Sequence, residues 1–399
     1  MTARVAHVTT IDQSLRYLLL NQLRSIADAG YQVTGMSAPG PDVSALEAHG
    51  IRHIAVPLTR RLTPLADLRA LLRLYRVFRR ERFTIVHTHT PKPGLLGQLA
   101  ARMASVPVIV NTIHGFYFHE HMPPAQRRFY IAMERIAARC SDLILSQSSE
   151  DLDTAVRLGI CPRERIQLLG NGIDIQRFER NRIDPAHLAR LRQTLGLPPS
   201  APVIGFVGRL VAEKGVIELA RAVQQVQSHS GPVTLLIVGG VDREKTDALT
   251  PADVQAAAGT TTCVFAGVRQ DMPEMYALMD IFALPSYREG FPRAAMEASA
   301  MGIPCVVTDV RGCREAVEHG RNGFLTPLRD VDALADALVR LLQDASLRAV
   351  MGATGRSMAR ERFDEQHVFQ RVIGAYRRLL REKGLPAPES AAMPATSRA

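Results

Sequence analysis

The sequence predicts an α/β protein made of two units, each a parallel sheet covered by helices. Short β-rich runs alternate with helical stretches from the start of the chain, beginning with Val5–Thr9 and Leu15–Ala29. The same rhythm restarts at Pro202–Val207 and Val216–Gln227. Such alternation is typical of parallel sheets, because a parallel strand needs a crossover helix to return the chain. With 399 residues, 46% of them hydrophobic, the chain is long enough for two separate cores.

Each expected element follows from its local pattern. Strands are short runs rich in Val, Ile and Leu, and helices repeat apolar residues at a spacing of three and four. The remaining expected strands are Val33–Ser37, Ile51–Val56, Thr84–His87, Val106–Asn111, Leu143–Ser146, Thr234–Val238, Cys263–Phe265, Ile281–Leu284 and Cys305–Thr308. The remaining expected helices are Pro64–Phe83, Leu95–Ala104, Met272–Met279 and Pro292–Ala300, followed by helical patterns after Val331 and from Gln366.

Turn-forming residues divide the chain. Gly170, Asn171 and Gly172 open a charged stretch that ends in Leu197-Pro198-Pro199-Ser200, which interrupts the pattern. We therefore predict a first domain at 1–170, a hinge and linker at 171–200 and a second domain at 201–365. We expect a terminal helix at 366–383 to pack back on the first domain. The segment 384–399, rich in Pro, Ala and Ser, is expected to be disordered.

Composition narrows the class of protein. The five cysteines form no C-x-x-C pair, so neither a disulfide framework nor a zinc site is predicted, which indicates a reducing, cytoplasmic compartment. The N-terminus lacks a signal-peptide pattern, and no window is apolar enough to span a bilayer. Neither a P-loop nor a G-x-G-x-x-G fingerprint is present, which disfavours ATP and NAD.

Positive charge is concentrated in the first half of the chain. The net charge is +10, and residues 1–180 hold 23 Lys and Arg against 15 Asp and Glu. The expected helix Pro64–Phe83 carries much of this charge beside leucines at helical spacing. An ordinary solvated basic face is one interpretation, and adhesion to anionic lipid on the inner face of the cytoplasmic membrane is the other. Nucleic acid is not expected as a partner, because no aromatic platform or helix-turn-helix accompanies the charge. The arginines of this region are Arg52, Arg60, Arg61, Arg69, Arg73, Arg76, Arg79, Arg80 and Arg82.

The most informative segment runs from Leu284 to Ala298, where an apolar strand passes through a glycine turn into a helix. Ligands of open α/β sheets bind beyond the carboxyl ends of strands, where such turns lie. A helix beginning near Pro292 has unpaired backbone N–H groups suited to a diphosphate. Glu297, farther into this helix, could accept hydrogen bonds from ribose hydroxyls. A surface helix with incidental acids is the alternative.

A second segment, Ile204–Gly215, also ends a strand and opens a helix. It brings Arg209 and Lys214 to the same edge of the second sheet. A leaving diphosphate develops negative charge, which fixed cations stabilise. Without the partner segment, two surface cations in a loop would be the simpler interpretation.

Two histidine-bearing segments follow strands of the first unit. His87 and His89 lie in Val86–Gly94, and we expect their polar groups to line an interdomain cleft. The other segment carries His114, His119 and His121, whose spacing matches no zinc pattern, so no metal is predicted. For His114, a structural role and a substrate hydrogen bond both remain open.

Together these motifs resemble glycosyltransferase family 4. The resemblance rests on Gly208-Arg209 with Lys214-Gly215, on Glu289-Gly290-Phe291-Pro292 with Glu297, and on Gly302-x-Pro304, and it covers nearly the whole chain. The segments Val86–His89, Thr112–Gly115 and Asn171–Asp174 are similar to the bacterial branch that extends polyprenyl-diphosphate-linked sugars, including N-acetylgalactosaminyltransferases of glycan assembly. So are Leu284–Tyr287 and Gly312–Ala316.

The resemblance implies the GT-B fold, with two facing Rossmann-like domains and an interdomain cleft. It also implies a retaining, metal-independent transferase with a nucleotide-sugar, expected to be a UDP-hexose or UDP-N-acetylhexosamine, as co-substrate and no other cofactor. The expected acceptor is a polyprenyl-diphosphate-linked sugar.

The resemblance also implies roles for particular residues. Gly208, Arg209 and Lys214 would meet the donor diphosphate, and Glu297 the ribose. Glu289 and the Gly290–Pro292 segment would meet the donor sugar, and His114 would approach it from the first domain. Relatives often have a double-glycine turn after the first strand, where this chain has Thr9–Ser14. Ser14 is the candidate to replace that phosphate contact.

Two rival functions stay open at this stage. One is a sugar-nucleotide epimerase of the same two-domain shape, which needs no acceptor. The other is a non-catalytic protein that senses a nucleotide sugar.

Overall fold

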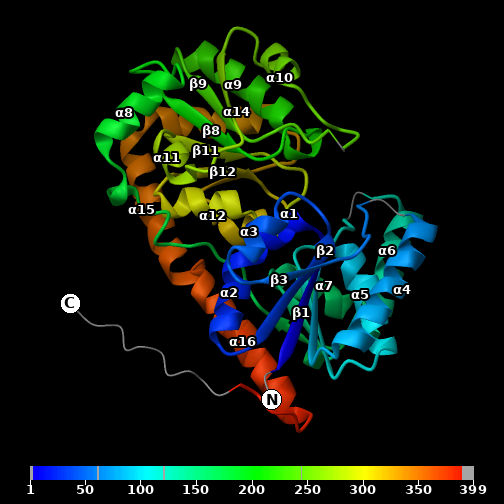
Figure 1. Cartoon of the computed structure of the whole chain (residues 1–399). Helices are drawn as coiled ribbons and strands as arrows, with labels where there is room; N and C mark the ends of the chain where they lie inside the picture. The colour runs from blue at the N-terminus through cyan, green and yellow to red at the C-terminus, as the bar shows by residue number, and fades with distance from the viewer. Residues whose placement is uncertain (1–2, 61–62, 120–121, 244, 389–399) are drawn as a thin grey trace. The chain divides into compact units, whose positions relative to one another are not determined.

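The computed structural model describes residues 3–60, 63–119, 122–243 and 245–388. The chain divides into two compact units (Figure 1). Unit 1 is the chain up to Gly170 together with the segment from Gln366 onward, and unit 2 is Asn171–Glu365.

Unit 1 contains a seven-stranded sheet, ordered β3-β2-β1-β4-β5-β6-β7, whose neighbouring strands are all parallel. Its strands are β1 Arg4–Ile11, β2 Gln32–Ala38, β3 Arg52–Ala55, β4 Ile85–His89, β5 Val108–Ile113, β6 Leu143–Ser146 and β7 Ile166–Leu168. Its helices are α1 Asp12–Ser14, η1 Leu15–Leu19, α2 Leu20–Asp28, α3 Val43–Glu47, α4 Pro64–Glu81, α5 Pro91–Met103, α6 Pro124–Cys140, α7 Ser149–Arg157, η2 Arg163–Arg165 and α16 Glu365–Glu382.

Alternate residues of the unit 1 strands enter two different cores. Val5 and Ile85 pack in a cluster with Phe369 and Val372 of α16. The neighbouring positions, such as Val86, pack with α4 and α5 on the other face. The period of two along a strand produces this division, and helices cover both faces as a parallel sheet requires.

Unit 2 repeats the plan with a six-stranded parallel sheet, ordered β10-β9-β8-β11-β12-β13. Its strands are β8 Val203–Val207, β9 Thr234–Val238, β10 Thr262–Gly267, β11 Ile281–Leu284, β12 Cys305–Thr308 and β13 Gly323–Thr326. Its helices are η3 Arg180–Arg182, α8 Pro185–Thr194, η4 Ala212–Lys214, α9 Val216–Ser230, α10 Pro251–Ala258, α11 Met272–Ala277, α12 Arg293–Ala300, α13 Cys313–Ala316, α14 Val331–Gln343 and α15 Ala345–Arg362.

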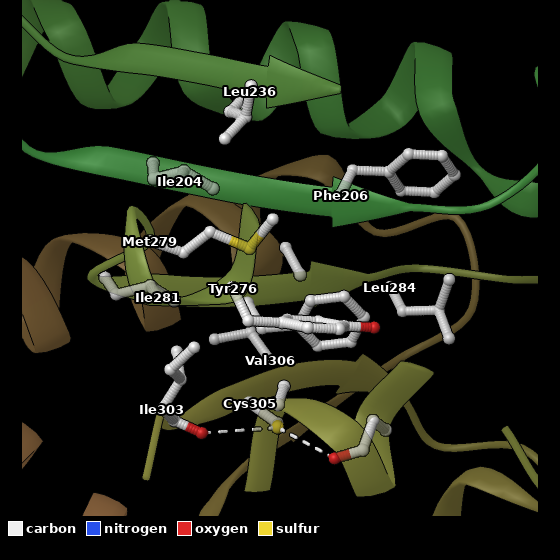
Figure 2. Close-up of a cluster of buried hydrophobic side chains, with 14 of the residues drawn as sticks. Ile204, Phe206, Leu236, Tyr276, Met279, Ile281, Leu284, Ile303, Cys305 and Val306 are labelled. Atoms are coloured by element: carbon white, nitrogen blue, oxygen red, sulfur yellow. Dashed lines mark hydrogen bonds between the residues drawn. The ribbon is translucent and has the colours of Figure 1, made fainter. Parts of the chain in front are cut away.

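The core of unit 2 is tightly fitted around its central strands. Figure 2 shows Ile204 and Phe206 of β8 above Met279, Ile281 and the ring of Tyr276. A Cβ atom at Gly205 would lie 2.0 Å from the Met279 sulfur, so any larger residue here would have to displace the buried Met279 side chain. The packing fixes β8 against β11, the two strands from which the candidate site is built.

The chain passes between the units at two points that are bonded to each other within unit 2. The Ile173 N–H donates to the Phe363 carbonyl at 2.8 Å, and the Glu365 N–H donates to the Ile173 carbonyl at 3.1 Å. The predicted linker 171–200 is largely part of unit 2, since Ile173, Phe178 and Leu191 enter its core.

The segment 384–399, where the sequence predicts disorder, is described only as far as residue 388. In that part, Leu385 and Ala387 pack against the α16 cluster of unit 1. Residues 389–399 of the predicted tail lie outside the described part of the chain. So do Arg61 and His121.

Helix α4 confirms the predicted helix, but the leucines that recur along it do not all face the core. Leu74, Val77 and Phe78 are buried, whereas Leu65, Leu68 and Leu72 are 77%, 53% and 38% exposed. The leucines at the start of the helix therefore face outward beside the arginines. Among the described residues, no helix is both long enough and apolar enough to cross a membrane.

Candidate active site

The candidate site of unit 2 lies where the strand order reverses. The chain runs outward from β8 to β9 and β10, then returns to β11 on the other side of β8. At such a reversal the loops that leave the two central strands diverge, which leaves space for a ligand beyond the strand ends. The loops here are 208–215 after β8 and 285–292 after β11, the two segments that the sequence singled out.

The two loops are joined through their backbones. The Tyr287 N–H donates to the Glu213 carbonyl at 2.8 Å. Gly215 has φ +68°, and a Cβ atom there would lie 2.0 Å from the Pro285 carbonyl oxygen. Only glycine tolerates both this left-handed backbone and this close approach, so Gly215 lets one loop rest directly on the other.

Lys214 and Glu289 form an ion pair between these loops. The Lys214 Nζ lies 2.5 Å from Glu289 Oε1, and the Ser286 hydroxyl donates to the same oxygen at 2.6 Å. The two side chains are 18% and 10% exposed. Because a largely buried carboxylate needs such partners, Lys214 and Ser286 hold Glu289 fixed in position.

Arg209 lies at the same edge with acidic partners of its own. Its guanidinium bonds Asp242 at 2.6 Å and Glu213 at 3.4 Å, and its side chain is 45% exposed. Glu213 also meets Lys245 and Arg288. At this edge the cationic side chains of Arg209, Lys245 and Arg288 therefore lie against the carboxylates of Glu213 and Asp242.

The Glu289–Pro292 segment is held from two other parts of unit 2. The Asn171 side-chain amide donates to the Phe291 carbonyl at 3.2 Å. Gly312, with φ +87°, lies so close that a Cβ atom would be 2.4 Å from the Gly290 carbonyl oxygen. The segment's backbone is thus fixed before any ligand binds.

Glu297 lies on α12 and is partly buried. Pro292 is the N-cap of this helix, so the first helical N–H groups belong to Arg293 and the residues after it. The Tyr276 hydroxyl donates to Glu297 Oε2 at 2.9 Å, and Tyr276 itself lies fully buried in the core of Figure 2. Burial raises the pKa of Glu297 above its ordinary value. Sequence reasoning missed Tyr276, because no local motif marks it.

The histidines of unit 1 lie at the corresponding reversal, between β1 and β4. The prediction that His87 and His89 line a cleft is wrong, because they are 0% and 1% exposed. They share one face of β4, which packs against α16. His7 of β1 is also fully buried, pairs in register with His87, and was not predicted. His114 lies after β5 and is only half-buried.

Ser14 ends α1, after β1, and is half-buried. The neighbouring turn is held by other groups. Asp12 accepts the Asp42 N–H at 2.8 Å, and the Thr10 and Thr90 hydroxyls are 3.0 Å apart. The role of Ser14 at a phosphate stays a prediction.

Two family models match the chain. The glycosyl transferase 4-like domain matches residues 16–172, and the model for glycosyl transferases group 1 matches residues 201–344. A UDP-Gal:alpha-D-GlcNAc-diphosphoundecaprenol alpha-1,3-galactosyltransferase of Escherichia coli is 31% identical over 299 residues, 74% of this chain and 76% of the relative. The chain belongs to glycosyltransferase family 4.

Further similarities support this glycosyltransferase assignment. The capsular polysaccharide biosynthesis glycosyltransferase CapM of Staphylococcus aureus is 27% identical, over 95% of this chain and 98% of the relative. The crystal structure of Anabaena Alr3699/HepE in complex with UDP-glucose matches with a TM-score of 0.80 at 23% identity, covering 94% of this chain and 99% of that chain. The glycosyltransferase therefore has the GT-B fold, and membership of the family favours glycosyl transfer over the epimerase reaction.

Proposed function

We propose that this glycosyltransferase moves a hexose or N-acetylhexosamine from a UDP-linked donor to a saccharide carried on a polyprenyl diphosphate, in the assembly of a surface polysaccharide or glycan. The observation that carries the proposal is the junction of loops 208–215 and 285–292, where Lys214, Glu289 and the first turn of α12 lie at one strand reversal. The E. coli relative, named for a UDP-galactose donor and a diphosphoundecaprenol-linked acceptor, supports the choice of substrates.

The proposed donor site assigns each group a separate task. Arg209 and Lys214 bind the diphosphate, Gly208 lets the backbone approach it, and Glu297 accepts hydrogen bonds from the ribose. Glu289 and the backbone of Gly290–Pro292 bind the donor sugar, and His114 contributes from unit 1. Lys214 then exchanges part of its contact with Glu289 for a phosphate oxygen, which frees carboxylate lone pairs for sugar hydroxyls.

We propose that transfer retains the anomeric configuration and needs no metal ion. Two fixed cations at the diphosphate can stabilise the negative charge that develops as UDP leaves. The departing phosphate oxygen would accept the proton of the acceptor hydroxyl as the new glycosidic bond forms on the same face of the sugar.

The test is release of nucleotide from a panel of UDP- and GDP-sugars, with and without a polyprenyl-diphosphate-linked sugar, in EDTA. We expect acceptor-dependent release that Glu289→Ala and Lys214→Met abolish and that Arg221→Met, an exposed substitution on α9, leaves unchanged. Nucleotide release that needs no acceptor, with the donor sugar recovered as its epimer, would instead show an epimerase. A product with inverted anomeric configuration, or activity lost in EDTA and restored by Mg²⁺, would contradict the finer proposal.

We also propose that α4 binds the anionic membrane that carries the acceptor. The exposed Leu65, Leu68 and Leu72 recur at helical spacing, so they share one face with Arg76. An amphipathic helix of this composition can insert its leucines at the headgroup boundary while its arginines meet lipid phosphates.

Vesicle co-sedimentation tests the membrane contact. Arg73, Arg76 and Arg79 replaced together by Gln should release the protein from phosphatidylglycerol vesicles. The matched control replaces Arg182, Arg190 and Arg221, which are exposed on unit 2. Equal binding by both triple variants would remove α4 from the membrane contact.

A further inference from the structure

A continuous chain of hydrogen bonds runs through the interior of unit 1 and reaches His114. The Thr112 hydroxyl lies 2.7 Å from His87 Nε2, and His87 Nδ1 lies 2.6 Å from the Tyr376 hydroxyl. That hydroxyl lies 3.2 Å from His7 Nε2. His7 Nδ1 then meets His89 Nε2 at 3.0 Å, and His89 Nδ1 meets His114 Nε2 at 3.1 Å.

The interior members of this chain are sealed from water. His7, His87, His89 and Tyr376 are at most 1% exposed, and Thr112 is 3% exposed. Burial lowers the pKa of His7 to about 3, and it lowers the pKa values of His87 and His89 well below the ordinary range. These imidazoles are therefore neutral near pH 7, each with one N–H donor and one acceptor nitrogen.

Neutral rings joined through both nitrogens transmit the direction of donation. If Thr112 donates to His87, then His87 donates to Tyr376 and Tyr376 donates to His7. His7 in turn donates to His89, and His89 donates to His114. In the reverse arrangement every proton moves to the opposite side of its bond, and His114 becomes the donor to His89.

Thr112 favours one of the two arrangements. Among the residues that the structure describes, the Thr112 hydroxyl has one hydrogen-bond partner, His87. Donation from Thr112 uses that proton, whereas the reverse arrangement leaves a buried hydroxyl proton without an acceptor. An unmade buried hydrogen bond costs about 1–3 kcal/mol, so donation from Thr112 is favoured.

We propose that this chain, from Thr112 through His87, Tyr376, His7 and His89, fixes His114 as the tautomer that is protonated on Nδ1. His114 Nε2 accepts the proton of His89, so the proton of His114 itself lies on Nδ1. An imidazole protonated at Nδ1 donates from that nitrogen, and oxygen atoms such as those of a sugar hydroxyl or an N-acetyl carbonyl are suitable acceptors. Thr112, His87, Tyr376, His7 and His89 are positioning residues for His114, and the use of that N–H at the sugar rests on the proposed function.

The three buried histidines could also be considered as a metal site. Their ring nitrogens come within 4.8 Å of one another. Each of these nitrogens already meets one of the hydrogen-bond partners above, so a metal ion would have to break the chain. The hydrogen-bonded arrangement accounts for all of the contacts.

The test reads the His114 tautomer by ¹H–¹⁵N NMR of the full-length protein, with the His114 signal assigned by its loss in His114→Asn. We expect Nδ1 protonated and Nε2 unprotonated in the wild type. Thr112→Val, which removes the hydroxyl with little change of shape, should change the His114 signal to a mixture or to the opposite tautomer. Thr112→Ser should restore the wild-type pattern.

A second pair of variants interrupts the chain at its middle. Tyr376→Phe should alter the His114 tautomer, whereas Tyr31→Phe should not. Tyr31 is the matched control, because its buried ring meets Tyr376 edge-on and its hydroxyl takes no part in the series of hydrogen bonds from Thr112 to His114. With a working donor, Thr112→Val and Tyr376→Phe should lower kcat/KM about tenfold, the effect of losing one oriented hydrogen bond.

Several results would overturn the proposal. One is an Nε2-protonated His114 in the wild type, and another is a His114 signal that Thr112→Val and Tyr376→Phe leave unchanged. Stoichiometric zinc in the purified protein that is lost on replacement of His7 would show a metal site instead. The NMR measurement needs no substrate, so its result does not depend on whether the proposed function is right. Conversely, acceptor-dependent nucleotide release by the wild type does not depend on which His114 tautomer is present.

Discussion

Replacing the buried His7 by Gln should remove a large part of the acid sensitivity of unit 1. Burial lowers the pKa of His7 from 6.5 to about 3. Between these values the unfolded chain binds a proton that the folded chain does not, so stability is full above about pH 6.5 and falls as the pH decreases. From about pH 7.5 to about pH 5, His7 alone costs the fold about 2 kcal/mol. His87 and His89 shift in the same direction and add to this loss.

One acidic residue of the same unit acts in the opposite sense. Burial and the neighbouring Asp151 raise the pKa of Glu134 from 4.5 to about 7. The folded state therefore gains about 2 kcal/mol from Glu134 over the same acid step, which masks the effect of His7 in the wild type. The contribution of Glu134 to the free energy of unfolding cancels when the wild type is compared with His7→Gln, because both proteins carry Glu134. Gln also keeps one donor and one acceptor for the neighbours of His7.

Urea unfolding at the two pH values measures the difference. Cys161 is buried in unit 1, so its labelling by 4,4′-dithiodipyridine, which reacts with thiols in acid, reports the opening of this unit when it is followed at the Cys161 peptide by mass spectrometry. The stability gap between wild type and His7→Gln should change by about 2 kcal/mol in favour of the variant at about pH 5. His49→Gln, an exposed control in unit 1, should show no such change. Parallel losses in wild type and His7→Gln would refute the reasoning.

Two further predictions concern unit 2. Tyr276→Phe removes the donor to Glu297 and should weaken UDP binding about tenfold, as calorimetry would measure; unchanged affinity would show that Tyr276 does not orient Glu297 for the ribose. Gly312→Ala places a methyl group 2.4 Å from the Gly290 carbonyl oxygen at a backbone φ of +87°, so transfer should be lost together with about 1–3 kcal/mol of stability. Wild-type melting and turnover of the Gly312→Ala protein would mean that this loop adjusts without cost.

The sequence predicts the layers of the fold well, because the alternation of strands and helices is a local signal. The runs at β1, β8 and β11 were all expected, and so were the glycine turns that follow β8 and β11. Parallel strands end at one edge of a sheet, so the sequence alone places the loops with Arg209 and Glu289 together. Helix α6, Pro124–Cys140, and the short strands β7 and β13 were missed.

Contacts between distant segments could not be predicted in the same way. Tyr376 meets His87 across 289 positions, and Tyr276 meets Glu297 across 21. The parity of His7 with Val5 in β1, and of His87 with Ile85 in β4, could have indicated that these histidines face the core. The prediction that His87 and His89 line a cleft is wrong because it relies on the polar character of histidine and not on the alternation of buried positions along the strand.

Each unit has the same kind of strand reversal, but the residues at the two reversals differ in character. In unit 2 the reversal carries glycine-rich loops and charged side chains that keep some exposure, as a ligand site requires. In unit 1 the reversal is filled by three neutral histidines, a threonine and a tyrosine, at positions where Val5 and Ile85 continue an apolar core. Polar networks of this kind are costly if any member is left unsatisfied, and apolar side chains would fill the space with less risk. Leucines in these positions would therefore stabilise the core of unit 1 at least as well as the hydrogen-bonded side chains do. What the hydrogen bonds add is a defined proton position at the half-buried His114.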